Sequence, residues 1–253
     1  MALVTQATKA AQPPVPDSAS PSRWRAFLRA RFTREGAVGL YLTVGFLACA
    51  VLVVLFGFLA DEVFGVHGST ALDRQITAAI EHVHTPARDR VALTMTRLGS
   101  HEILIPATLL LTGALLWRKH RVSAVLFAGS VLGGWLLETL LKIIFHRARP
   151  DLWQALVSEK TFSFPSGHAT MASLFYGGAA AVVLHNWKRP SVRRAALAAA
   201  TVVIFGVSYS RVYLGAHWAS DVAAGVVVGL FWVTVCATGT EYLARRTRKT
   251  DGV

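Results

Sequence analysis

Three short stretches of this chain combine basic residues, histidine and carboxylate in spacings that suit chemistry on a phosphate group. In the first, KIIFHRARP, Lys142 and Arg149 are seven residues apart, so both would point to one face of a helix that Pro150 ends. Two cations on one face of a helix can hold an oxyanion such as phosphate. Snorkelling of Lys and Arg to a membrane interface would produce the same pattern.

The second stretch, FPSGHAT, comes directly before an apolar run. Ser166 is expected at the N-cap of the helix that follows, and Gly167 would let a ligand approach the backbone closely. The free amides and the positive dipole end of a helix start bind anions, and His168 would lie beside such an anion. The alternative is an ordinary capped helix with an incidental histidine.

The third stretch, SRVYLGAHWASD, places His217 and Asp221 four residues apart at the start of another apolar run. That spacing puts a carboxylate one helical turn from an imidazole, where it can fix the tautomer and leave the other ring nitrogen free to attack. Arg211 adds a guanidinium with several donors. A purely structural hydrogen bond between His217 and Asp221 is the alternative.

The elements that must position these residues are long apolar segments. Hydrophobic residues make up 53% of the 253 residues and charged residues only 16%, with a mean hydropathy of +0.46. This composition and six apolar runs predict an all-α polytopic membrane protein, a bundle of six transmembrane helices. The runs cover residues 37–60, 103–117, 122–141, 169–184, 195–213 and 218–238. The second and fourth runs are short, so we expect both helices to begin earlier, in a polar turn.

Charge separates the connections into two groups. If the six spans alternate, 17 Lys and Arg and four acidic residues fall on the side of both termini, against nine and ten on the other side. This asymmetry predicts cytoplasmic termini in an inner (plasma) membrane protein. It also explains the net charge of +12 without nucleic-acid binding. The same topology puts the three polar stretches at the membrane–water interface on the outer side.

The chain is therefore expected to contain three segments. Residues 1–36 form a disordered, basic cytoplasmic segment, residues 37–240 the six-span domain, and residues 241–253 a basic cytoplasmic tail. Within the domain, residues 61–100 are too polar for a span and predict one or two amphipathic helices on the outer surface. The histidines there, His82, His84 and His101, lack metal-ligand spacing and are expected at the surface.

Glu138 is an ionisable residue in the apolar part of the third run, one turn before Lys142. A carboxylate there is costly unless it is paired, so we expect Glu138 to pair with Lys142 or another cation of the motifs and to orient it. The alternative is a carboxylate near enough to the interface to remain hydrated.

Together the three stretches resemble the type 2 phosphatidic acid phosphatase superfamily, whose pattern is K-x6-R-P, then P-S-G-H, then S-R-x5-H-x3-D. Every position of the pattern is present, from Lys142 to Asp221. The resemblance implies an integral membrane lipid phosphatase that needs no metal or other cofactor. Its substrate would be a lipid phosphate such as phosphatidic acid, phosphatidylglycerol phosphate or undecaprenyl pyrophosphate. The motifs do not distinguish among these lipids, and the sequence carries no signal for an oligomeric state.

The resemblance also implies the role of each residue. His217 would attack phosphorus and form a phosphohistidine, Asp221 would orient it, and His168 would protonate the leaving oxygen. The phosphate would be bound by Lys142, Arg149, Ser166, Gly167 and Arg211. A vanadate-dependent haloperoxidase would use the same pocket, but six spans argue against that soluble branch. A membrane transporter would need its charges deep within the bundle rather than at one face.

Overall fold

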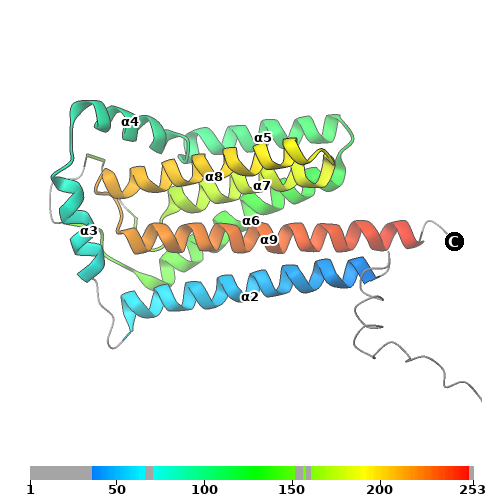
Figure 1. The fold of residues 1–253 in the computed structure, drawn as a ribbon, viewed down its shortest axis with the longest axis horizontal. Coiled ribbons are helices and arrows are strands. Elements are labelled where there is room, and N and C mark those ends of the chain that lie inside the picture. Colours follow the sequence, from blue (N-terminus) through cyan, green and yellow to red (C-terminus); the bar gives the residue numbers. More distant parts are fainter. Residues whose placement is uncertain (1–35, 66–70, 152–155, 158–160, 251–253) are drawn as a thin grey trace, which may run out of the picture. The chain divides into compact units, whose positions relative to one another are not determined.

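The computed structural model describes residues 36–65, 71–151, 156–157 and 161–250. The chain divides into two compact units, residues 1–40 and 41–253, and the account below concerns the second. Eight helices are described in all (Figure 1): α2 (Gly36–Phe64), α3 (Ala71–Glu81), α4 (Pro86–Arg97), α5 (His101–Trp117), α6 (Arg121–Phe145), α7 (Gly167–Asn186), α8 (Pro190–Tyr213) and α9 (Ala219–Thr250).

The predicted apolar runs all form helices, and no strand occurs within the described residues. Five helices are long and apolar enough to cross a membrane: α2, α6, α7, α8 and α9. Helix α5 alone has only 17 residues, but α4 and α5 join at a bend of 41° and are apolar enough together; counted as one broken span, they bring the number to six. The all-α, polytopic prediction is confirmed, and the predicted six spans are reached when the bent pair of α4 and α5 is counted as one.

Two predicted boundaries differ from the structure. The segment 61–100 begins with the last turn of α2 and then forms two separate helices, α3 and α4. The basic segment 241–253 continues α9 as far as Thr250, because nothing in its sequence breaks the helix before Gly252. Nearly all of the N-terminal segment 1–36 lies outside the described residues.

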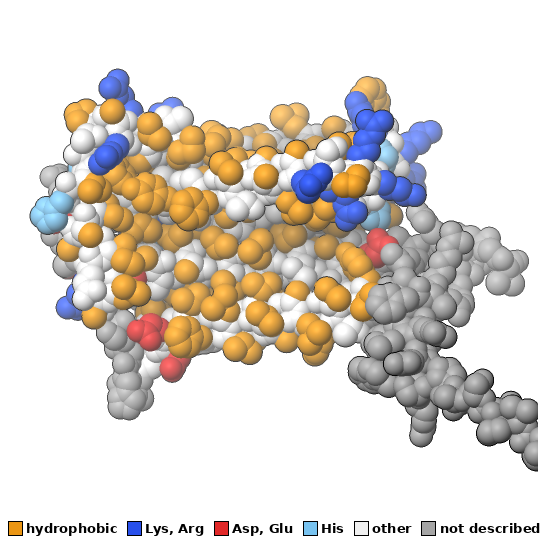
Figure 2. Space-filling model, in the orientation of Figure 1, with side chains coloured by type: hydrophobic (Ala, Val, Ile, Leu, Met, Phe, Trp, Pro, Cys, Tyr) orange, Lys and Arg blue, Asp and Glu red, His pale blue; other side chains and the backbone are white. Residues whose placement is uncertain are grey.

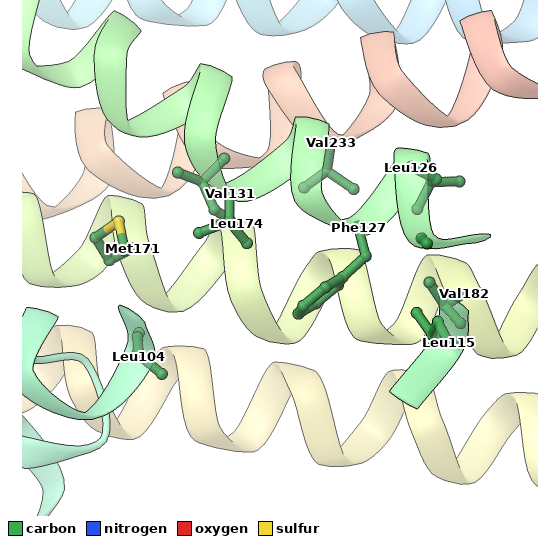
Figure 3. Packing of buried hydrophobic residues seen from close by; sticks show 10 residues of the cluster. Leu104, Leu115, Leu126, Phe127, Val131, Met171, Leu174, Val182 and Val233 are labelled. Atoms are coloured by element: carbon green, nitrogen blue, oxygen red, sulfur yellow. The ribbon is translucent and has the colours of Figure 1, made fainter. Parts of the chain in front are cut away.

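The interior of the bundle is apolar and is built from α5, α6, α7 and α9 (Figure 3). Phe127 of α6 and Leu174 of α7 are fully buried at its centre, and Leu104 and Val233 approach from α5 and α9. Many large apolar side chains on the outside are instead exposed, including Val54, Leu110 and Phe205. Figure 2 shows hydrophobic side chains over the middle of one face and Lys and Arg toward its two ends. This pattern suits a lipid environment, and the chain is a multi-pass membrane protein.

Helices α7 and α9 approach each other closely through glycine. A Cβ atom at Gly229 would lie 2.4 Å from Cβ of Ser173, and one at Gly225 would lie 2.6 Å from the carbonyl oxygen of Ser166. Small residues spaced four apart allow such contact between membrane helices. The contact fixes the start of α9, which follows His217, against the start of α7, which carries His168.

Candidate active site

The three polar stretches meet at one end of the bundle. The connections from α6 to α7 and from α8 to α9 both lie at the end where α3 and α4 are found (Figure 1). The turns that carry Lys119 and Lys188 lie at the opposite end. Residues that are far apart in the sequence therefore gather at a single membrane face, as the alternation of spans predicts.

His217 lies in the short loop before α9, and its side chain is 1% exposed. Its Nε2 atom is 3.0 Å from Nη1 of Arg149. A guanidinium can only donate, so this contact requires a lone pair on Nε2 and places the proton of a neutral ring on Nδ1. Nε2 thus faces the predicted phosphate site in the form that a nucleophile needs.

Nδ1 of His217 faces Asp221, which is fully buried. The Nδ1 atom lies 3.5 Å from Oδ2 of Asp221 and 3.4 Å from the hydroxyl of Ser163. The same carboxylate oxygen accepts hydrogen bonds from the Ser163 hydroxyl and, at 3.0 Å, from the backbone N–H of Trp218. The predicted pairing of His217 with Asp221 is present as a 3.5 Å contact, and Ser163 shares it.

Burial decides the charge of His217. Removal from water lowers the pKa of His217 from 6.5 to about 4, and the nearby Arg149 and Arg211 act in the same direction. The hydrogen bond and the charge of Asp221 raise the pKa and offset part of this effect. His217 is therefore neutral at physiological pH, and its unprotonated Nε2 accepts the hydrogen bond from Arg149.

Lys142 and Glu138 form the ion pair that the sequence predicts. Nζ of Lys142 lies 3.2 Å from Oε1 of Glu138, whose side chain is 4% exposed. Gly167 faces this pair, since a Cβ atom there would be 3.1 Å from Oε1 and 3.5 Å from Nζ. The absence of a side chain at Gly167 keeps the space beside the ammonium group open.

Thr161 joins the two cations of the first motif. Its hydroxyl lies 3.2 Å from Nζ of Lys142 and 3.1 Å from Nη2 of Arg149. Arg149 also donates to the carbonyl oxygens of Thr161, Phe162 and Ala216. These backbone contacts hold the guanidinium plane in place beside His217, a preorganised arrangement for a bound oxyanion.

Ser166 occupies the N-cap position of α7, but its hydroxyl makes no capping hydrogen bond. The N-cap prediction is therefore right for the position and wrong for the side chain. The hydroxyl is buried without a hydrogen-bond partner among the described residues, while the backbone N–H donates to the carbonyl oxygen of Asp221 at 3.0 Å. The second contact ties the start of α7 to the start of α9.

Arg211 and His168 complete the set that the sequence singled out. Arg211 is 1% exposed and donates to the hydroxyl of Thr96 on α4 at 2.7 Å. His168 is within electrostatic range of Arg211, His217 and Lys142. Its backbone packs on Gly99, where a Cβ atom would meet the His168 carbonyl oxygen at 3.0 Å. The last turn of α4 therefore supports Arg211, and the short link to α5 supports His168.

Several residues at the site carried no signal in the sequence. In the sequence, Arg147 is only one of the basic residues counted on the predicted outer side. Asp73 belongs to a segment that was predicted to form a helix on the outer surface. Both are buried, and both connect to Asp221 through the ion pairs of Arg147. Ser163 lies just before the P-S-G-H motif, and Ser220 occupies an unspecified position between His217 and Asp221, so their places in the sequence were their only possible signal.

The predicted surface location is confirmed for His82, whereas His84 and His101 are half-buried, and the ring of His101 lies 6.4 Å from that of His168. The side chain of His84 is 19% exposed, with Nδ1 2.9 Å from Oδ1 of Asp89 and its ring 4.4 Å from that of Tyr213. The Tyr213 hydroxyl donates to the same carboxylate oxygen at 2.7 Å. These contacts fasten the start of α4 to the end of α8. Among the described residues, no three His, Cys, Asp or Glu side chains are grouped as metal ligands would be.

These features define a class of protein: a helical membrane protein with fixed cations around a neutral, buried histidine at one membrane face. A sequence model of the PAP2 superfamily matches residues 103–245, more than half of the chain, and the chain belongs to this superfamily.

Relatives of this chain include membrane lipid phosphatases. Phosphatidylglycerophosphatase B of Bacillus subtilis (strain 168) is 29% identical over 181 residues, 71% of this chain and 89% of that protein. An undecaprenyl-diphosphatase of Sulfolobus acidocaldarius is 26% identical over 198 residues, 76% of this chain and 90% of that protein. The crystal structure of a transmembrane PAP2-type phosphatidylglycerolphosphate phosphatase from Bacillus subtilis has a TM-score of 0.67 and 27% identity, covering 74% of this chain and 93% of that chain.

Proposed function

We propose that this chain hydrolyses a phosphomonoester or a pyrophosphate of a membrane lipid through a phosphohistidine on His217. The observation that carries the proposal is the 3.0 Å contact between Nε2 of His217 and Arg149. It supports a neutral nucleophile whose lone pair is directed at a cation, where a phosphate would be held for attack. Asp221 would orient the ring through Nδ1 and stabilise the positive charge that phosphorylation creates.

The phosphate would be held by fixed charges and backbone amides. Lys142, Arg149 and Arg211 would supply the cations, Ser166 would donate through its hydroxyl, which lacks a partner among the described residues, and Gly167 through its backbone N–H at the start of α7. These donors would stabilise the charge that spreads over the phosphoryl oxygens in the transition state. The role assigned to Glu138 is to position Lys142.

His168 would act twice in the proposed reaction. It would donate a proton to the leaving oxygen as His217 attacks phosphorus, and would then accept a proton from the water that hydrolyses the phosphohistidine. Its place in the first turn of α7, beside the predicted phosphate amides, supports this assignment.

The proposed substrate is a lipid with a terminal phosphate or diphosphate at the outer surface of the inner (plasma) membrane. The two relatives carry names that refer to phosphatidylglycerophosphate and to undecaprenyl diphosphate. Both are membrane lipids with a phosphate that a membrane-face site can reach. The charge asymmetry of the connections supports cytoplasmic termini and an active site that faces outward.

The test uses the purified full-length protein in detergent with a chelator present. Wild-type protein should release inorganic phosphate from at least one of phosphatidic acid, phosphatidylglycerol phosphate and undecaprenyl pyrophosphate. A ³²P-labelled substrate should label His217 transiently, and His217→Ala should abolish both label and release. Phosphate release that persists in His217→Ala would refute the proposed nucleophile.

A further inference from the structure

A chain of buried charges connects α3 to the carboxylate behind His217. Nη1 of Arg147 donates to Oδ1 of Asp221, and Nη2 donates to Oδ2 of Asp73 at 2.8 Å. Ser220 contacts the same two side chains. Its hydroxyl accepts a hydrogen bond from Nη1 of Arg147 at 2.8 Å and donates to Asp73, and its backbone N–H donates to Asp73 at 3.0 Å. One guanidinium thus bridges two carboxylates from helices that are far apart in the sequence.

All three charged groups are shielded from water. Asp73, Arg147 and Asp221 are 6%, 8% and 0% exposed. Buried ions are expensive to desolvate, and such a group contributes to stability only when every member is paired. Asp73 lies outside the region that the superfamily model matches, and Arg147 occupies an unspecified position of the K-x6-R-P pattern. If Arg147 only stabilised the fold, a single carboxylate would be enough to pair with its guanidinium.

We propose that Asp73 and Arg147 are positioning residues of the active site: they hold Asp221 against His217 and leave its negative charge available to the phosphorylated imidazole. This inference rests on the proposed function. Arg147 alone would neutralise Asp221, whereas Arg147 shared with Asp73 gives a set with a net charge of −1. The ring of His217 becomes positively charged when Nε2 bonds to phosphorus while Nδ1 keeps its proton, and this set balances that charge.

The other charged groups around His217 make this balance necessary. Arg149 from the loop after α6 and Arg211 from α8 are cations that oppose a positive imidazole, and His168 faces it from α7. Asp221 is the group that favours the charged ring. Because burial already lowers the pKa of His217 to about 4, a further loss of negative charge would make the ring less basic and a weaker nucleophile.

The experiment compares Asp73→Asn with wild type in the full-length protein. Asparagine keeps the size and one acceptor but removes the charge. We expect kcat to fall by about tenfold with KM changed less than about twofold, because the affected charge forms only during the chemical step. The titration of the His217 ring, followed by NMR with histidine-selective labelling and assigned with His217→Gln, should move to lower pH. Asp73→Glu should recover most of both properties.

Glu81→Gln is the matched control, because it removes a carboxylate from an exposed position on the same helix. It should leave kcat and the His217 titration unchanged. A loss of kcat in Asp73→Asn that accompanies a lower melting temperature, with the His217 titration unmoved, would overturn the inference in favour of a structural clamp. A wild-type protein inactive on every lipid phosphate would overturn the proposed function instead, and the titration would then decide the charge coupling by itself.

Discussion

At the scale of single residues, the two nitrogens of His217 have different surroundings. Nε2 meets Arg149 at 3.0 Å, and Nδ1 faces Asp221 and Ser163. This asymmetry fixes the tautomer, and burial keeps the ring neutral. The sequence could indicate the residue types and the spacing of four, but the tautomer depends on Arg149, which is 68 residues away along the chain.

The first prediction concerns acid stability. The pKa of His217 is lowered in the folded protein to about 4, while an unfolded chain takes up the proton at about 6.5. The folded state therefore binds fewer protons between these values, and its stability falls as the pH drops from 6.5 to 4. Between pH 7 and pH 5, wild type should lose on the order of 5 °C more in melting temperature than His217→Gln. Equal losses in both proteins would contradict the low pKa of His217.

The second prediction uses the proposed acid role of His168 to distinguish substrates. Phosphatidic acid must expel an alkoxide, which depends on a proton, whereas a prenyl pyrophosphate expels a weakly basic phosphate monoester. His168→Ala should slow phosphohistidine formation from phosphatidic acid by roughly 100-fold or more, and from undecaprenyl pyrophosphate by much less. Rapid-quench measurement of the first turnover is required, because later water attack is common to both substrates. Equal slowing would mean that His168 is not mainly a leaving-group acid.

The third prediction concerns the pair of Glu138 and Lys142. If Glu138 acts by orienting the ammonium group, Glu138→Gln should raise KM or lower kcat several-fold in the wild-type background, and should cost little more when added to Lys142→Ala. Glu62→Gln, which changes an exposed carboxylate of α2, serves as the control. A double-mutant cycle with fully additive losses would show that the two residues act independently.

At the scale of the elements, the site depends on how closely the starts of α7 and α9 approach. The backbone of Ser166 donates to the carbonyl oxygen of Asp221, and Gly225 and Gly229 let the two helices pack without side chains between them. The aromatic rings of Phe56, Phe64 and Phe145 also enclose Phe164, the residue two positions before Ser166. Helices α2 and α6 thereby support the turn that precedes α7.

The fourth prediction tests the contact between α7 and α9. A Cβ atom at Gly229 would lie 2.4 Å from Ser173, so Gly229→Ala must push the helices apart. We expect a loss of roughly 1–3 kcal/mol in stability and a lower kcat, because His217 moves relative to α7. Gly113→Ala on α5 is the matched control, since a Cβ atom there has no neighbour within 4 Å. That variant should be as stable as wild type or more so, because alanine favours the helix. Normal activity in Gly229→Ala would show that the close approach is dispensable.

At the scale of the whole molecule, the apolar runs and the family pattern were sufficient to predict the spans and the gathering of the motifs at one face. They could not predict the contacts that α3 and α4 make with the active site. The amphipathic pattern of residues 71–81 suits a helix on a membrane surface, yet its Asp73 is buried against Arg147. Local sequence indicates which face of a helix is polar, whereas the partner of that face is set by packing between segments distant along the chain.

The last prediction tests the orientation of the whole molecule, with single cysteines in a chain from which Cys49 and Cys236 have been removed. His82 lies in an exposed turn beside α3, and Ser191 is exposed near the start of α8 at the opposite end. The excess of Lys and Arg on the side of Ser191 favours retention of that side in the cytoplasm. A cysteine at position 82 should therefore react with a membrane-impermeant thiol reagent added to intact cells, and one at position 191 only after permeabilisation. The opposite labelling pattern would place the active site in the cytoplasm, where its substrate would have to come from the inner leaflet.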